Sequence, residues 1–423
     1  MDGLRASAWR WIAVLAISGF LPVASAARGG QREDWPQFHG PRRDNRSTET
    51  RLLKAWPSDG PRRVWTARGL GHGFATLALA QEAIYTSGDR GGKAVISSLD
   101  RNGRLLWQTE NGPAWEASVP GSRGTPTIDG GQLYHENAHG DVVCLDAKTG
   151  HKHWGLNILA EFRAKNINWG LAESLLIDGE HVICCPGGPE TAIAALDKHT
   201  GRTVWKSPSA DDLAGYASPA LGEFQGLRMI FTLTSRAAIA VNADSGELLW
   251  RFEQITPFEE TITMPVYHDG HVLISTRTAG TALLELQVDG KKCSVREVWR
   301  CKDLDNQHGG LVLLDGYLYG SSHVNTGGKW ICVEWKTGKV MHIERGVGKG
   351  SLTYADGMLY TLSENQTLGL VKATPAGHEV LSQFKIPAGG EGPSWAHPVV
   401  CGGRLYIRHS DFLYAYDIGA ADR

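Results

Sequence analysis

Two short stretches of the sequence have residue types and spacings that could carry out chemistry. His135-Glu136-Asn137-Ala138-His139 matches the motif in which a helix places two histidines on one zinc ion and the glutamate acts as the base. Gly346-Val-Gly-Lys-Gly-Ser351 combines the glycines, the lysine and the hydroxyl of a phosphate-binding loop. Each motif works on one kind of backbone, so its meaning depends on the elements that carry it.

The local sequence argues against both functions. His135 and His139 lie on a predicted strand and its turn, where residues four apart are separated by about 13 Å. Two ligands of one zinc ion must each reach it at about 2 Å, so we predict no metal site. The stretch 346–351 lacks the full phosphate-loop spacing and no helical pattern follows it. We expect it to connect two strands.

The elements that position these residues follow from an internal repeat. Tryptophans that close one kind of segment recur at intervals of 42, 47, 51, 45 and 49 residues, at Trp65, Trp107, Trp154, Trp205, Trp250 and Trp299. This period is typical of a propeller blade of four strands. The clearest unit runs from Gly124 to Trp154.

Two kinds of turn recur with the same period. Asp129-Gly130 separates two short apolar strands, because glycine accepts the positive φ of a tight hairpin. Asp146-Ala-Lys-Thr-Gly150 is the second kind, in which the aspartate bonds its own turn and the glycine takes the left-handed position. Helical periodicity is nearly absent. The sequence therefore predicts an all-β protein.

Counting the repeats predicts an eight-bladed β-propeller, with seven blades as the alternative. Its inner strands are expected to start near residues 72, 123, 169, 216, 263, 309, 350 and 395. The last unit has three strands, and we expect residues 62–67 to supply the fourth and close the ring. The predicted propeller covers residues 62–418, with an N-terminal surface segment at 27–61 and a C-terminal tail at 419–423.

The first 26 residues predict an exported protein, periplasmic or secreted. Arg5 and Arg10 flank the start of an apolar run, residues 11–21, and Ala24-Ser25-Ala26 suits a signal peptidase. This run is too short to span a bilayer, so we expect a cleaved signal peptide and no transmembrane segment in the mature chain. A net charge of -2 with dispersed lysines and arginines argues against nucleic-acid binding.

The repeat resembles a known family. A strand, Asp-Gly, Leu-Tyr, then Gly140-Asp-Val-Val-Cys-Leu-Asp-Ala-Lys-Thr-Gly150 and a closing Trp are similar to the pyrrolo-quinoline-quinone (PQQ) type of propeller repeat. Quinoprotein alcohol dehydrogenases and the outer-membrane assembly lipoprotein of the BamB type share this repeat. The resemblance covers residues 62–418 and implies that each closing tryptophan packs between neighbouring blades. Residues 168–174 and 391–398 resemble secreted bacterial members of this superfamily.

The quinoprotein resemblance implies PQQ with calcium as a cofactor and a disulfide between adjacent cysteines against the cofactor ring. Cys184 and Cys185 are such a pair. They lie on a predicted strand, where neighbouring side chains point to opposite faces, so two buried thiols are the alternative to a disulfide. No position matches the calcium ligands or the catalytic aspartate of those enzymes, and no cofactor is evident from the residues themselves.

The candidate ligand site is one mouth of the central channel. Residues just before each inner strand should line it, and they are polar and aromatic: His72, Arg123, Trp169, Glu173, Tyr216, His308, Lys349, Trp395 and His397. Such a set suits a planar anionic ligand or a peptide. The alternative is that these side chains solvate a water-filled channel.

Three functions follow from these observations. The first is an exported binding or scaffold protein that engages a small ligand or a protein partner at one channel mouth, because no catalytic constellation is evident. The second is a PQQ-dependent oxidoreductase, which leaves an enzymatic activity open. The third is a BamB-like outer-membrane assembly scaffold, which the absence of a cysteine for lipid attachment near the cleavage site weakens.

Overall fold

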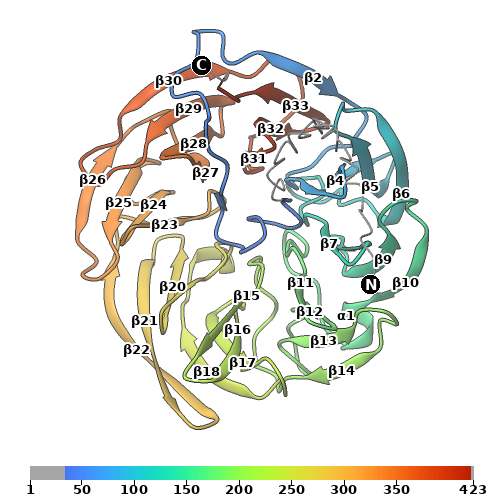
Figure 1. The fold of residues 1–423 in the computed structure, drawn as a ribbon. Coiled ribbons are helices and arrows are strands. Elements are labelled where there is room, and N and C mark those ends of the chain that lie inside the picture. The colour runs from blue at the N-terminus through green and yellow to red at the C-terminus, as the bar shows by residue number, and fades with distance from the viewer. Residues whose placement is uncertain (1–33, 421–423) are drawn as a thin grey trace, which may run out of the picture. The chain divides into compact units, whose positions relative to one another are not determined.

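A computed structural model describes residues 34–420, so the predicted signal peptide and the end of the predicted tail lie outside the described residues. The described residues form eight antiparallel sheets that follow one another around a central channel (Figure 1). Each sheet is one blade of four strands, and blade 7 carries a short fifth strand at its inner edge. The eight-bladed propeller is thus confirmed and the seven-bladed alternative is wrong.

The four strands of blades 1 to 7 run from the channel to the rim in chain order, whereas in blade 8 the outermost strand is β2 from the N-terminal part of the chain. The strands of blades 1 to 4 are β3 (Ala78–Ala80), β4 (Ala83–Arg90), β5 (Lys93–Asp100) and β6 (Leu105–Pro113); β7 (Thr127–Asp129), β8 (Gln132–Glu136), β9 (Asp141–Asp146) and β10 (Lys152–Asn157); β11 (Leu176–Asp178), β12 (His181–Cys184), β13 (Ala194–Asp197) and β14 (Thr203–Lys206); β15 (Ala220–Phe224), β16 (Leu227–Leu233), β17 (Ala237–Asn242) and β18 (Leu248–Glu253).

The strands of blades 5 to 8 are β19 (Val266–His268), β20 (His271–Thr276), β21 (Gly280–Asp289) and β22 (Lys292–Cys301); β23 (Val312–Leu314), β24 (Tyr317–Ser321), β25 (Trp330–Glu334) and β26 (Val340–Glu344); β27 (Gly350–Ala355), β28 (Met358–Ser363), β29 (Thr367–Lys372) and β30 (Val380–Lys385); β31 (Val399–Cys401), β32 (Arg404–His409), β33 (Phe412–Asp417) and β2 (Arg63–Ala67). Two short helices, α1 (Ile158–Glu161) and η1 (Pro257–Glu259), lie between blades. Within residues 34–420, no helix combines the length and apolarity needed to cross a membrane.

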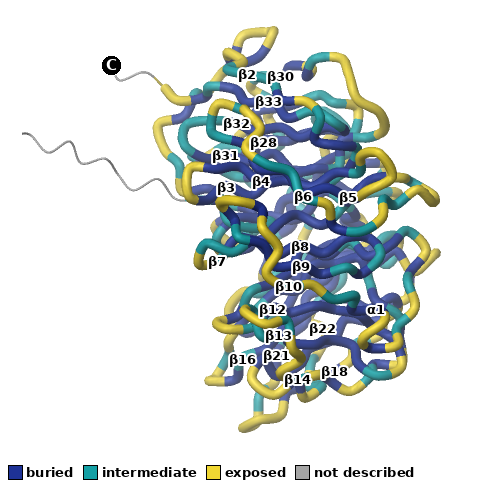
Figure 2. The backbone as a smooth tube through the Cα atoms, turned by 90° about the vertical axis from the view of Figure 1, so that its right-hand side faces the viewer, coloured by how far each residue is buried: buried dark blue, intermediate teal, exposed yellow. Residues whose placement is uncertain are grey.

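The inner three strands of each blade are mostly buried and the turns between strands are exposed (Figure 2). The hairpin turns follow the predicted chemistry, since Gly130 and Gly131 have φ of 54° and 83° between β7 and β8. The stretch at 346–349 connects β26 to β27, as expected from the absence of a following helix.

The closing tryptophans join neighbouring blades. Trp107 on the outer strand of blade 1 donates its indole N–H to the carbonyl of Ala147 in blade 2 at 3.2 Å. Its ring packs on Gly150, the last residue of the blade 2 turn, where an added Cβ would lie 2.6 Å from a ring carbon. The same ring-on-glycine contact recurs at four more seams: Trp65 with Gly103, Trp154 with Gly201, Trp205 with Gly246, and Trp299 with Gly338. The glycine of the repeat is therefore required by both φ and space.

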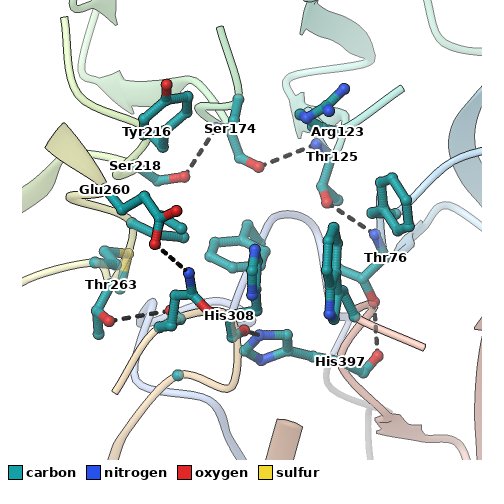
Figure 3. A pocket seen from close by; sticks show the side chains of 18 of the residues that line it. Thr76, Arg123, Thr125, Ser174, Tyr216, Ser218, Glu260, Thr263, His308 and His397 are labelled. Carbon is teal, nitrogen blue, oxygen red and sulfur yellow. Dashed lines mark hydrogen bonds between the residues drawn. The ribbon is translucent and has the colours of Figure 1, made fainter. Parts of the chain in front are cut away.

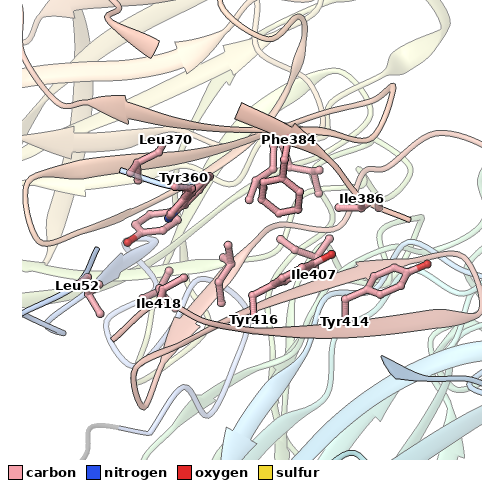
Figure 4. Packing of buried hydrophobic residues seen from close by; sticks show 14 of the residues in the cluster. Leu52, Tyr360, Leu370, Phe384, Ile386, Ile407, Tyr414, Tyr416 and Ile418 are labelled. Carbon is pink, nitrogen blue, oxygen red and sulfur yellow. The ribbon is translucent and has the colours of Figure 1, made fainter. Parts of the chain in front are cut away.

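The N-terminal strand closes the ring as predicted. β2 pairs antiparallel with β33, so residues from both ends of the propeller complete blade 8. Between blades 7 and 8, a cluster of buried side chains that includes Tyr360, Phe384, Ile407 and Tyr416 seals the seam (Figure 4). The closing sheet leaves β33 no open edge.

Residues 35–47 depart from the expected surface segment, because they enter the centre of the ring, and we call them the channel plug (Figure 1). Inner strands present unpaired edge groups to the channel, and the plug supplies partners for them. Its bonds reach six blades, through Trp35 with Leu79, Pro36 with Ile128, Arg43 with Ser174 and Leu175, Arg46 with Leu313, Asn45 with Leu352 and Thr353, and both His39 and Asn45 with His397. Its last two residues form β1 (Arg46–Ser47), which pairs parallel with β27.

A candidate ligand site at the channel mouth

A cavity of about 410 Å³ occupies the channel mouth at which the inner strands begin. Seven of the nine predicted mouth residues line it: Arg123, Trp169, Tyr216, His308, Lys349, Trp395 and His397. The structure thus brings together residues from loops that are up to 274 positions apart in the chain. The channel plug forms the floor of this cavity with Phe38 and His39.

The other two predicted residues lie outside the cavity. Glu173 is buried behind the wall, because its neighbours Ala172 and Ser174 face the cavity and side chains alternate along an extended backbone. Its Oε1 accepts the backbone N–H of Cys185 at 2.7 Å. His72 lies further out, where its Nδ1 and the Ser410 hydroxyl are 2.9 Å apart.

A row of rings and a guanidinium group forms one wall. His308 stacks on Trp395 with centroids 4.0 Å apart and planes 4° from parallel. Phe74 follows in this row, with its centroid 4.5 Å from that of Trp395. The row ends at Arg123, whose guanidinium carbon lies 5.8 Å from the Phe74 centroid. Trp169 and Tyr216 contribute a second aromatic pair with centroids 5.8 Å apart. The cavity is therefore lined by aromatic side chains of the kind that hold small ligands.

Two of the three cations that line the cavity are paired with carboxylates. Arg277 donates two bonds to Glu260, at 2.8 and 2.9 Å, and Gln307 donates a third at 2.8 Å. Lys349 lies 2.9 Å from Glu364, which also accepts the indole N–H of Trp395 at 2.8 Å. These carboxylates are engaged in structural pairs.

Arg123 differs from the other two cations. Its terminal nitrogens donate to the carbonyls of Val119 and Gly121 in its own loop, and no carboxylate within the described residues is in ion-pair distance. Burial lowers the pKa of its guanidinium to about 10, against the raising effect of Asp89. The Asp89 carboxylate itself accepts the backbone N–H of Trp115 at 2.9 Å. Arg123 is a positive charge at the cavity wall whose counter-charge is remote.

The floor of the cavity is held by neutral histidines. His397 Nε2 lies 2.8 Å from the carbonyl oxygen of His308, so this nitrogen carries the proton and Nδ1 is an acceptor. Two groups of the channel plug, His39 Nε2 and Asn45 Nδ2, lie 3.2 Å from that Nδ1. Burial lowers the pKa of His397 to about 4 and that of His39 well below its usual value.

Hydroxyl groups link neighbouring blades around the cavity wall (Figure 3). The backbone N–H groups of Thr76, Thr125 and Ser174 donate to the side chains of Thr125, Ser174 and Ser218, at 3.1, 3.0 and 2.8 Å. Thr76 Oγ1 in turn donates to the carbonyl of His397 at 2.8 Å. These bonds run from blade to blade and fix the wall residues beside them.

A second cavity of about 430 Å³ lies at the opposite end of the inner strands. It is lined by the other side of the channel plug, with Arg42, Asp44 and Arg46, and by strand ends such as Ile177 and Tyr267. His39 and Met264 line both cavities. The plug therefore divides the channel into two separate compartments.

The histidines of the zinc-like motif do not converge. His135 is buried in β8, where Asn111 lies 2.9 Å from its Nδ1, and His139 in the following turn lies 3.1 Å from the carbonyl of Ala114. Within residues 34–420, no three metal-ligating side chains gather at one point.

The residues do not fit PQQ with calcium. Cys184 and Cys185 are unbonded thiols that pack in two different clusters on opposite faces of blade 3, and neither lines the cavity. Burial raises the pKa of both thiols well above its usual value. The two cavity carboxylates, Glu260 and Glu364, are held by Arg277 and Lys349. We therefore derive no redox step from this site.

The sequence did not indicate the cavity residues that lie elsewhere than just before an inner strand. Phe38 and His39 come from the channel plug, for which the repeat gives no signal, and Arg277 and His323 come from loops between the second and third strands of blades 5 and 6. A signal did exist for the hydroxyl groups, because Thr76, Thr125, Ser174, Ser218 and Thr263 recur two to three residues before the inner strands β3, β7, β11, β15 and β19.

Together, the ring of eight blades, the tryptophan seams and the mouth cavity define a PQQ-type repeat propeller. A family model described as outer membrane protein assembly factor BamB matches residues 92–344, more than half of the chain. The chain belongs to this family.

Individual relatives share the fold at low identity. The quinoprotein alcohol dehydrogenase PedH of Pseudomonas putida is 26% identical over 182 residues, which are 40% of this chain and 29% of PedH. The outer membrane protein assembly factor BamB of Shewanella oneidensis is 23% identical over 60% of this chain and 66% of its own length. The crystal structure of BamB from Moraxella catarrhalis superposes with a TM-score of 0.61 at 16% identity, over 85% of this chain and 98% of that one.

Proposed function

We propose that the protein is a non-catalytic binding propeller that takes a small ligand into the mouth cavity. The main observation in support of this proposal is the cavity, whose volume of about 410 Å³ falls in the size range of small-molecule sites. Its wall combines two aromatic pairs with polar groups fixed by bonds between blades. A non-catalytic role is supported by the pairing of both cavity carboxylates, which leaves no free acid or base of that kind at the wall.

A cavity-filling variant tests this proposal. Ala172 lines the cavity, so Ala172→Phe should obstruct it, whereas Ala55 is exposed outside it and Ala55→Phe is the matched control. A library of small organic acids, amines and neutral aromatics is screened by thermal shift on the full chain. Compounds that stabilise the wild type and the Ala55→Phe protein, but not Ala172→Phe, support the proposal. If every stabilising compound acts equally on all three proteins, the cavity is not the site.

A protein-scaffold role is the second candidate, and the family match favours it. Phe258 is 70% exposed on the loop that also carries the cavity residue Glu260, and aromatic residues are enriched in protein–protein interfaces. Crosslinking from Phe258 in cells that express the protein, with the exposed Leu105 as control position, tests it. A partner crosslinked at Phe258 alone supports this role. Location outside the cytoplasm is part of the proposal and is checked by fractionation and N-terminal sequencing.

A further inference from the structure

The charges of the cavity point to a class of ligand, an inference that rests on the proposed function. We propose that the ligand is a flat monoanion, with its negative group on Arg123 and its ring plane against the aromatic wall. Three cations and two carboxylates line the cavity. Because Arg277 pairs with Glu260 and Lys349 with Glu364, one positive charge remains, and it belongs to Arg123.

Arg123 is held in a geometry that suits an anion. Its two bonds to Val119 and Gly121 anchor the guanidinium, and the rings of Phe74 and Trp115 flank it at 5.8 and 5.9 Å. A guanidinium has five N–H donors, so hydrogens remain on both terminal nitrogens for a carboxylate or sulfonate. Being pre-oriented, the group loses little entropy when the anion binds.

Asp89 is the carboxylate that acts electrostatically on Arg123. It is absent from the cavity lining, and its carboxylate accepts the backbone N–H of Trp115. It contributes an attraction to Arg123 without occupying the donors that face the cavity. A monoanion therefore meets a compensating charge, whereas a tricarboxylate would bring two further charges with no counterpart at the wall.

The flat shape of the ligand follows from the wall. The parallel pair of His308 and Trp395 continues through Phe74 to Arg123, so a ligand that lies along this row meets the edges of the stacked rings and the charge at its end. A compound with a fused ring and one acidic group matches this row along its length. An aliphatic acid of the same charge would satisfy Arg123 but would not offer a ring face to the edges of these aromatic side chains.

The test compares three probes by calorimetry on the full chain. 2-Naphthoate is a flat monoanion, naphthalene-2-carboxamide is its neutral isostere, and PQQ is a tricarboxylate. We expect 2-naphthoate to bind at least about tenfold more tightly than either of the other two, the scale of one charge-assisted hydrogen bond. Arg123→Gln should remove this preference, and Arg90→Gln, at an exposed arginine outside the cavity, should keep it.

Arg123→Lys is a second variant in case Arg123→Gln does not fold, since lysine keeps the positive charge but lacks the planar guanidinium group. We expect 2-naphthoate to bind it with an affinity between those of the wild type and Arg123→Gln. Equal binding of the acid and the amide, preference for PQQ, or no binding of 2-naphthoate up to about 1 mM overturns the monoanion class. These outcomes differ from failure of the proposed function, in which no compound distinguishes Ala172→Phe from Ala55→Phe.

Discussion

Glu136 and Glu173 form a buried acid pair behind the cavity wall, at 3% and 4% exposure. The two carboxyl groups repel one another when both are charged, so burial favours a state in which one of them is protonated. Burial and the neighbouring Glu173 raise the pKa of Glu136 well above its usual value. Glu173 is the better-supported anion, because Cys185 donates to it and Arg43 of the channel plug attracts it.

Because the pKa of Glu136 is raised, this acid pair contributes more to the stability of the fold at low pH than at high pH. The unfolded chain loses the Glu136 proton near its ordinary pKa, while the folded chain holds it, so stability falls as pH rises above that value. We expect Glu136→Gln, which cannot ionise and keeps a donor toward Glu173, to raise the free energy of unfolding at pH 8 by about 1 kcal/mol. The gain should shrink toward pH 4.5.

Denaturant titrations at several pH values measure this effect. Glu173→Gln is the control, because it replaces the charged acceptor of the Cys185 N–H by a neutral one and removes the counter-charge of Arg43, and it should destabilise the protein at every pH. A Glu136→Gln protein that is less stable than the wild type at pH 8 would contradict the shared proton.

At the scale of elements, the tryptophan seam depends on the glycine that follows each Asp-x-x-Thr turn. Gly150 has φ of 72° and its missing Cβ leaves room for Trp107, whereas Gly179 has φ of 59° and open space around it. We expect Gly179→Ala to cost about 1–2 kcal/mol, the strain of a left-handed residue. Gly150→Ala should cost more, about 2–4 kcal/mol, because the added methyl also meets the ring.

Thermal unfolding of the two variants separates strain from packing. Trp107→Phe, with a smaller ring, should recover part of the loss in the Gly150→Ala background and none in the Gly179→Ala background. Equal destabilisation by the two alanines would mean that the ring contact contributes nothing.

Repeated elements were predictable, whereas contacts that occur once were not. The Asp-Gly turns, the tryptophan seams and the pairing of β2 with β33 follow from local rules repeated along the chain. Glu173 was placed at the mouth because it precedes an inner strand, but alternation of side chains turns it away. The channel plug is a single segment without a period, and the edge groups that draw it in belong to strands far away in sequence.

At the scale of the whole molecule, the channel plug ties six blades together and depends on neutral histidines. Protonation of His397 at Nδ1 would set a donor against the donors of His39 and Asn45. Since burial lowers the pKa of folded His397 to about 4, the unfolded or undocked state binds the proton first as pH falls. Stability of the docked plug is therefore present above about pH 6.5 and lost on the way to pH 4.

Hydrogen exchange of residues 35–47 between pH 7 and pH 4, corrected for the intrinsic rate, measures this loss. We expect protection of the plug to fall by at least about tenfold, and His397→Gln to flatten the dependence. His378, whose pKa burial also lowers to about 4, lies away from the plug against Trp330, so His378→Gln should leave the profile as it is in the wild type. Constant protection down to pH 4 would show that the histidines do not govern docking.

The pairing of β2 with β33 has a mechanical consequence. In the register of these strands Arg63 lies opposite Tyr416, so the entry to β2 and the exit from β33 are at the same end of an antiparallel pair. Tension applied between those two points loads the hydrogen bonds one after another, as in a zipper, and not all at once in shear. Tension between the entry to β2 and the exit from β33 would separate these two strands at low force. The ring would therefore open first at blade 8.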